Sequence, residues 1–181
     1  ARQVLDERLP DGRPVFTAHI IENTAALQAQ SALSTTALNR AYDFGGRLTC
    51  TGYQVRPSPA RPGESIRLLT YWQVKRADTS PLVMFVHLLG PDGAANGAAN
   101  GAANGALIAQ EDRLDVATET LHVNDAFLQT HRLQLPGDAP PGQYRLAFGL
   151  YSPITLARVA VDGAVGGNDH VELALTVLPV N

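Results

Sequence analysis

The sequence has 181 residues, of which 45% are hydrophobic and 17% are charged, and its formal net charge at pH 7 is −3. This balance is typical of a globular chain that can bury one substantial core, and not of a disordered chain. The weak negative charge provides no basic field that would attract nucleic acid or anionic lipid. A membrane-spanning helix needs about 18 consecutive apolar residues, and the sequence contains no such run. We therefore expect one globular domain, with or without a short extra segment, that binds no nucleic acid.

The first 44 residues differ in character from the rest. Residues 13–21 predict a short strand, residues 22–30 are rich in alanine and favour a helix, and residues 31–44 return toward extended structure. This order predicts a β-α-β segment over residues 1–44, which is too short to hold a core of its own. We expect it to dock on the main domain or to be a remnant of a preceding one. The sequence begins at Ala1 without a Met, so we also expect a piece of a longer protein.

Residues 45–181 have a β-rich pattern throughout. Short runs of apolar and polar residues are separated by turns that contain proline and glycine. The predicted strands cover residues 47–56, 64–75, 82–89, 107–114, 126–135, 143–151, 156–161 and 170–177. About eight short strands with such turns predict an all-β domain, a two-sheet antiparallel β-sandwich of the immunoglobulin-like or jelly-roll-like kind.

The clearest alternation lies in residues 63–89. One face of its first strand would carry Ile66, Leu68, Thr70, Trp72 and Val74, and the other face Arg67, Leu69, Tyr71 and Gln73. A polar connection over residues 75–81 leads to the second strand, so this segment predicts a hairpin at the centre of the sandwich. We expect Trp72, the only tryptophan, in the core and Tyr71 on the outward face.

A four-residue repeat, GAANGAANGAANGA, occupies residues 93–106. Repeated glycine disfavours a helix, and alanine, asparagine and glycine are all poor strand formers. We interpret the repeat as a flexible hairpin loop that lengthens the connection without reaching the core, because loop closure depends only weakly on length.

Catalytic and metal-binding signals are weak. No two of the five histidines have metal-ligand spacing, and the single cysteine, Cys50, has no local base, so we predict a buried thiol, no metal site and no cofactor. His87 lies mid-strand on an apolar face, and the partner strand would bring Glu111 or Asp112 close to it. We expect a structural His-carboxylate pair of His87 and Asp112 rather than a catalytic dyad.

Aromatic residues on an exposed sheet face could form a platform for stacking sugars. The candidates are Tyr53, Tyr71, Trp72, Tyr144 and Tyr151. The alternative is that these rings pack in the core and place their hydroxyls at the rim. As binding residues we select Tyr71, Tyr53 and Tyr151, of which Tyr71 is the best candidate for an outward orientation.

Several segments together resemble one known type of domain. They are LTCTGY (48–53), RPGESIRLLTYWQ (61–73), FVHLL (85–89), PDG (91–93), IAQED (108–112) and PPGQYRLAFGLY (140–151). Over roughly residues 45–178 the chain resembles the soluble β-sandwich at the C-terminus of bacterial polytopic membrane glycosyltransferases of the dolichyl-phosphate-mannose mannosyltransferase type. The repeat over residues 93–106 departs from the pattern of that family.

The resemblance implies a non-catalytic accessory domain on the extracytoplasmic face of the cell membrane. Its partner would be the membrane portion of the parent transferase, which carries the chemistry, and it would pack there or present a glycan or acceptor. Two alternatives stay open because β-sandwiches host many functions. One is an independent carbohydrate-binding module. The other is a jelly-roll hydrolase, which would need a pocket that joins His87 to carboxylates.

Overall fold

The computed structural model describes residues 2–8, 14–21, 36–91, 105–162 and 169–180, with side chains from residue 41 onward. Its strands are β1 (Arg2–Arg8), β2 (Pro14–Ile21), β3 (Thr36–Phe44), β4 (Leu48–Arg56), β5 (Ser65–Val74), β6 (Val83–Leu89), β7 (Leu107–Asp112), β8 (Ala126–Gln134), β9 (Gly142–Tyr151), β10 (Val161–Asp162) and β11 (Val171–Val177). A short 3-10 helix, η1 (Thr118–Thr120), lies between β7 and β8.

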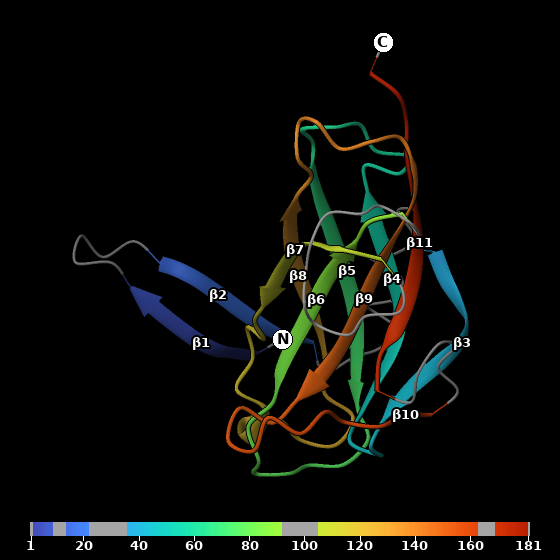
Figure 1. The fold of residues 1–181 in the computed structure, drawn as a ribbon. Coiled ribbons are helices and arrows are strands. Elements are labelled where there is room, and N and C mark those ends of the chain that lie inside the picture. The colour runs from blue at the N-terminus through green and yellow to red at the C-terminus, as the bar shows by residue number, and fades with distance from the viewer. Residues whose placement is uncertain (1, 9–13, 22–35, 92–104, 163–168, 181) are drawn as a thin grey trace.

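The strands form two sheets that pack face to face (Figure 1). The larger sheet has seven strands in the order β1-β2-β8-β5-β4-β3-β10, and the smaller has four in the order β11-β9-β6-β7. Neighbouring strands in both sheets are antiparallel. The predicted all-β, two-sheet antiparallel sandwich is therefore confirmed.

Strand β5 lies in the middle of the larger sheet, between β4 and β8. Its side chains alternate between buried and more exposed positions, because successive residues of a strand point to opposite faces. Trp72 is 1% exposed, and its ring lies 5.0 Å from that of Phe44 and 6.4 Å from that of Phe148, measured between centroids. The prediction that Trp72 lies in the core is confirmed, and Phe148 of β9 shows that this core joins the two sheets.

The N-terminal strands belong to the larger sheet. Strand β3 pairs with β4, and the last two residues of β2, Ile20 and Ile21, pair with Phe127 and Ala126 of β8. The hairpin of β1 and β2 extends away from the sandwich (Figure 1). The strands expected within 13–21 and 31–44 are present, whereas the helix expected at 22–30 and most of the repeat at 93–106 lie outside the described residues.

One predicted strand is wrong. Residues 156–161 were expected to form a strand, but residues 152–160 form a loop and β10 consists of Val161–Asp162 alone. The reason is a local hydrogen-bonded turn, in which the Leu156 N–H donates to the Ser152 carbonyl at 2.8 Å. Leu156 has a φ of 59°, so the chain reverses at the point where a strand would have to remain extended.

Cys50 lies fully buried on β4. Burial raises the pKa of its thiol to about 12, so the thiolate that reacts as a nucleophile is absent at neutral pH. Within the part of the chain that the structure describes, no helix is long and apolar enough to cross a membrane.

Candidate functional site

The outward face of the smaller sheet carries the candidate site. On β6 the side chains of Met84, Val86 and Leu88 point into the core, so those of Phe85 and His87 point outward. The strand register places Phe85 opposite Asp112 of β7 on one side and opposite Gly149 of β9 on the other. Residues that are distant in the sequence therefore meet on one surface.

The Phe85 ring packs closely against Gly149, its cross-strand neighbour on β9. A Cβ atom at position 149 would lie 2.5 Å from Phe85 Cζ, so only glycine lets the ring lie this close to the strand. The Arg158 guanidinium also lies over the Phe85 ring, at 4.5 Å from its centroid. A cation over an aromatic face is attracted by the ring quadrupole. These contacts leave Phe85 only 3% exposed although it points away from the core.

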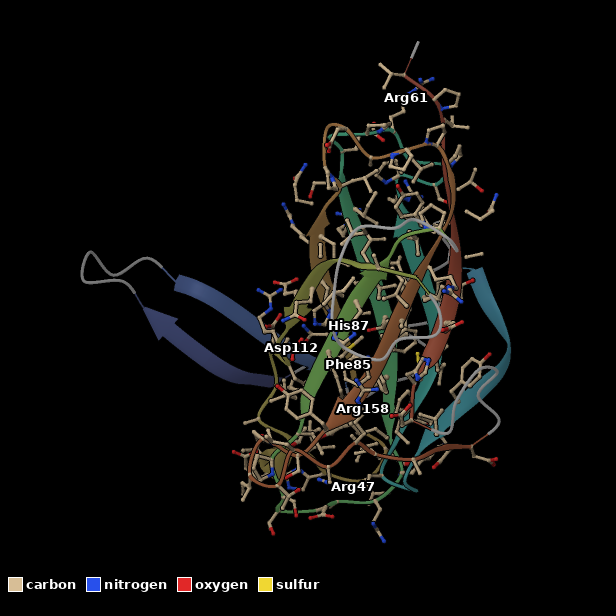
Figure 2. The ribbon with its side chains drawn as sticks, in the orientation of Figure 1. Arg47, Arg61, Phe85, His87, Asp112 and Arg158 are labelled. Carbon is tan, nitrogen blue, oxygen red and sulfur yellow. The ribbon has the colours of Figure 1, made fainter. Side chains whose placement is uncertain are left out.

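A hollow of about 250 Å³ lies at this position and is hereafter called the β6 hollow. Its lining residues are Phe85, His87, Asp112, Tyr151, Leu156 and Arg158. Four of them, Phe85, His87, Asp112 and Arg158, gather over the smaller sheet in Figure 2. The lining therefore combines aromatic rings with a carboxylate, a guanidinium, an imidazole and a phenol.

Hydrogen bonds orient the polar groups around the β6 hollow. The Tyr151 hydroxyl donates to Asp112 Oδ2 at 3.2 Å, and burial together with this carboxylate raises the pKa of Tyr151. Arg158 Nη1 donates to Asp169 Oδ2 at 3.0 Å, and His170 Nδ1 lies 2.7 Å from Asp169 Oδ1. Burial alone would raise the pKa of Asp169, but its bonds to His170 and Arg158 outweigh burial and lower it. Arg158 thus has a fixed position between the Phe85 ring and a carboxylate.

His87 and Asp112 both line the β6 hollow, and their expected His-carboxylate pair stays a prediction. Asp112 faces Phe85 across the β6–β7 ladder, while His87 faces Gln110, two residues further along. The carboxylate of Asp112 accepts its hydrogen bond from Tyr151, and the His87 ring packs 5.0 Å from that of Phe85. Partial burial lowers the pKa of His87, although the charge of Asp112 opposes this shift, so the imidazole is neutral at pH 7.

The three selected tyrosines lie on different surfaces. Tyr151 lines the β6 hollow. Tyr71 lies on the outward face of the larger sheet, where it pairs with Gly52 and Leu128. Tyr53 pairs with the buried Thr70 and packs against the core.

Sequence reasoning missed Phe85, Leu156 and Arg158 as lining residues. Phe85 reads as an ordinary apolar strand residue, and Arg158 as an ordinary surface cation. A signal was present in Gly149, a glycine in the interior of a predicted strand, which often marks a close approach of another group. Nothing in the sequence indicates which group approaches.

The β6 hollow is better suited to binding than to hydrolysis. Glycoside hydrolysis ordinarily needs two carboxyl groups, one of them a general acid with a raised pKa. Among the described residues, the lining contains one carboxylate, Asp112, and the pKa of nearby Asp169 is lowered. No group of three or more His, Cys, Asp or Glu side chains in the described ranges could hold a metal ion.

No family model matches this sequence, and no curated protein is significantly similar to it. Among solved structures, the chain is similar to the C-terminal domain of Wzt, with a TM-score of 0.53 and 13% identity over 82% of this chain and 84% of that one. It also matches a β-glucosidase from Listeria innocua in complex with isofagomine, at a TM-score of 0.40 and 16% identity over 77% of this chain and 16% of the enzyme. A third match is the CARDB domain of the PF1109 protein from Pyrococcus furiosus, at a TM-score of 0.39 and 12% identity over 82% of this chain and 97% of that one.

The likeness to Wzt concerns the fold alone and agrees with a β-sandwich domain. The glycosyltransferase resemblance of the sequence stays a prediction.

Proposed function

We propose that this chain is a non-catalytic accessory domain that binds a glycan in the β6 hollow. The observation that carries the proposal is the mixed lining, in which planar polar side chains surround packed aromatic rings. The larger setting follows the sequence resemblance: the domain belongs to a membrane glycosyltransferase, faces the extracytoplasmic side and presents a glycan or acceptor to the membrane portion.

The chemistry of the lining matches that of a sugar. Sugar hydroxyls both donate and accept hydrogen bonds, and the apolar C–H face of a sugar can pack on the partly exposed Tyr151 ring, since Phe85 is already covered. Asp112 can accept from a hydroxyl, and the neutral His87 imidazole can both donate and accept. Arg158 can only donate, and its contacts with Phe85 and Asp169 preorganise it. Groups already held in place lose less entropy when a ligand binds.

The size of the hollow limits the ligand. Ligand sites for drug-sized molecules are commonly about 300–1,000 Å³. At about 250 Å³, the β6 hollow suits a single sugar ring, such as a terminal residue, rather than a long buried chain.

A glycan-array screen of the purified chain, compared with the Asp112→Asn variant, tests the proposal. Asparagine keeps the shape of the side chain and can still accept from Tyr151, but removes the charge. A hydrogen bond to a charged group contributes about 1–1.5 kcal/mol more than one to a neutral group, so we expect affinity to fall by about five- to tenfold.

Tyr71→Ala is the matched control, because Tyr71 lies on the other sheet. Its glycan binding should equal that of the wild type. If Tyr71→Ala lost binding while Asp112→Asn kept it, the site would lie on the larger sheet and the β6 hollow would be excluded. Absence of binding to every glycan would refute the proposal and leave a packing domain.

A further inference from the structure

The rim of the β6 hollow contains a leucine in an unfavourable backbone conformation. Leu156 has a φ of 59°, in the left-handed region that glycine and asparagine adopt readily and that branched or bulky residues avoid. Its side chain is 73% exposed, so burial in the protein does not offset the strain. A glycine or an asparagine would serve the turn better.

The surrounding loop holds Leu156 firmly in this position. The Ser152 N–H donates to the Ala157 carbonyl at 3.0 Å, which closes residues 152–157 into a compact turn. The Ser152 hydroxyl oxygen accepts from the N–H groups of Ile154 and Thr155, each at 3.3 Å. Directly after the turn, Arg158 forms an antiparallel bridge with Tyr151. The turn is therefore anchored on the strand that supplies another lining residue.

The two large, exposed apolar side chains of this turn, Ile154 and Leu156, differ in one respect. Ile154 is 76% exposed and does not line the hollow, whereas the similarly exposed Leu156 does. The polar lining groups His87 and Asp112 come from the strands β6 and β7, and Leu156 adds apolar surface from the loop. Strain retained at the edge of a binding site is a recurrent sign of a functional side chain.

We propose that Leu156 is a specificity-determining residue, and that the glycan bound in the β6 hollow carries an apolar substituent at the sugar that contacts it. The methyl group of a 6-deoxy sugar or of an acetamido group has this chemistry. This inference rests on the proposed function. It adds that a sugar with a hydroxymethyl or hydroxyl group in place of this apolar substituent binds more weakly, because the hydroxyl loses water against the leucine side chain without gaining a hydrogen bond.

The test uses pairs of sugars that differ at one group: L-fucose against L-galactose, L-rhamnose against L-mannose, and N-acetylglucosamine against glucose. Affinities are measured by NMR titration of the isotope-labelled chain. In at least one pair we expect the sugar with the methyl group to bind about fivefold or more tightly, since burial of one methyl group has an effect of this size.

The variants Leu156→Asn and Leu156→Gly remove the apolar side chain but suit the left-handed backbone. Both should unfold at or above the wild-type temperature, because the strain is relieved. Both should reduce the preference within the sugar pair to about twofold or less. Ile154→Asn is the matched control and should keep the wild-type preference.

The outcomes separate the two proposals. Equal wild-type affinities within every pair would overturn the role of Leu156 while the β6 hollow remained a glycan site. A preference that persisted in Leu156→Asn and Leu156→Gly would also overturn it. If none of the sugars shifted the resonances of the hollow and the glycan array were negative as well, the proposed function itself would fail.

Discussion

The contact between Gly149 and Phe85 provides a quantitative prediction. In Gly149→Ala, the added Cβ would lie 2.5 Å from Phe85 Cζ and 2.6 Å from the backbone oxygen of Asp169. Ordinary contacts between carbon atoms are about 3.5–4.0 Å, so the ring must move by about 1 Å. It has little room to do so, since Arg158 lies over the ring and Phe85 is only 3% exposed. We therefore expect the substitution to overpack the site.

The size of the effect follows from two opposing contributions. Overpacking a well-packed site costs about 1–3 kcal/mol. Replacing glycine by alanine also stabilises by about 0.4–1 kcal/mol, because it restricts the unfolded chain. Gly149 lies within the extended strand β9 and has no left-handed φ, so no backbone strain is added. The expected net loss is about 1–2 kcal/mol in the free energy of unfolding, or about 2–8 °C in Tm.

Urea titration measures this loss, with the fluorescence of the buried Trp72 as the signal. Gly137→Ala is the control, because a Cβ atom there would meet nothing within 4 Å. Combining Gly149→Ala with Phe85→Leu should restore part of the stability, since leucine lacks Cζ and occupies less space. If Gly149→Ala were as stable as Gly137→Ala, the tight packing of Phe85 on β9 would be refuted.

Three further predictions concern the interior and the edge of the sandwich. Burial lowers the pKa of His131, whose Nε2 lies 2.9 Å from the Arg113 carbonyl oxygen. The contribution of His131 to the free energy of unfolding should therefore be complete above pH 6.5, and the free energy should fall by up to about 1.4 kcal/mol per pH unit below it. In urea titrations at several pH values, His131→Gln should show a shallower fall than the wild type, and an equal slope would contradict this prediction. Glu111 Oε2 accepts a hydrogen bond from the backbone N–H of Arg132 at 2.6 Å. Glu111→Ala should therefore lower the free energy of unfolding by about 1 kcal/mol. Glu111→Gln keeps an acceptor oxygen and should lower it by half that amount or less. The buried Cys50 thiol should resist modification by iodoacetamide at pH 8 in the folded protein and react with it in urea. Mass spectrometry detects the modified chain. Rapid modification of the folded chain would contradict the prediction and show that β4 opens.

The individual strands and their faces could be predicted from the sequence, because a period of two is a local property. The alternation in residues 63–74 placed Trp72 in the core and Tyr71 on the outward face, as the structure shows. The failed strand at residues 156–161 illustrates the limit of this reasoning. Its composition suits a strand, but the hydrogen bonds of Ser152 close a turn that no periodicity reveals.

The candidate site was only partly predictable, because it depends on the register between strands. His87 and Asp112 were selected as a pair and Tyr151 as a separate sugar-binding candidate, and the structure brings all three to the β6 hollow. Phe85 and Arg158 were not selected, since neither differs from an ordinary residue of its type until the two are seen in contact.

By itself, the sequence determined the all-β class, the approximate strands and the buried centre around Trp72, because composition, turns and alternation act over a few residues. Only the tertiary structure decided which strands pair and which side chains share a face. The Phe85 ring contacts both Gly149 and Arg158, two residues more than sixty positions further along the chain. Such contacts are set by the pairing of β6 with β9 and by the return of the loop at residues 152–160, and these follow from the packing of the whole sandwich.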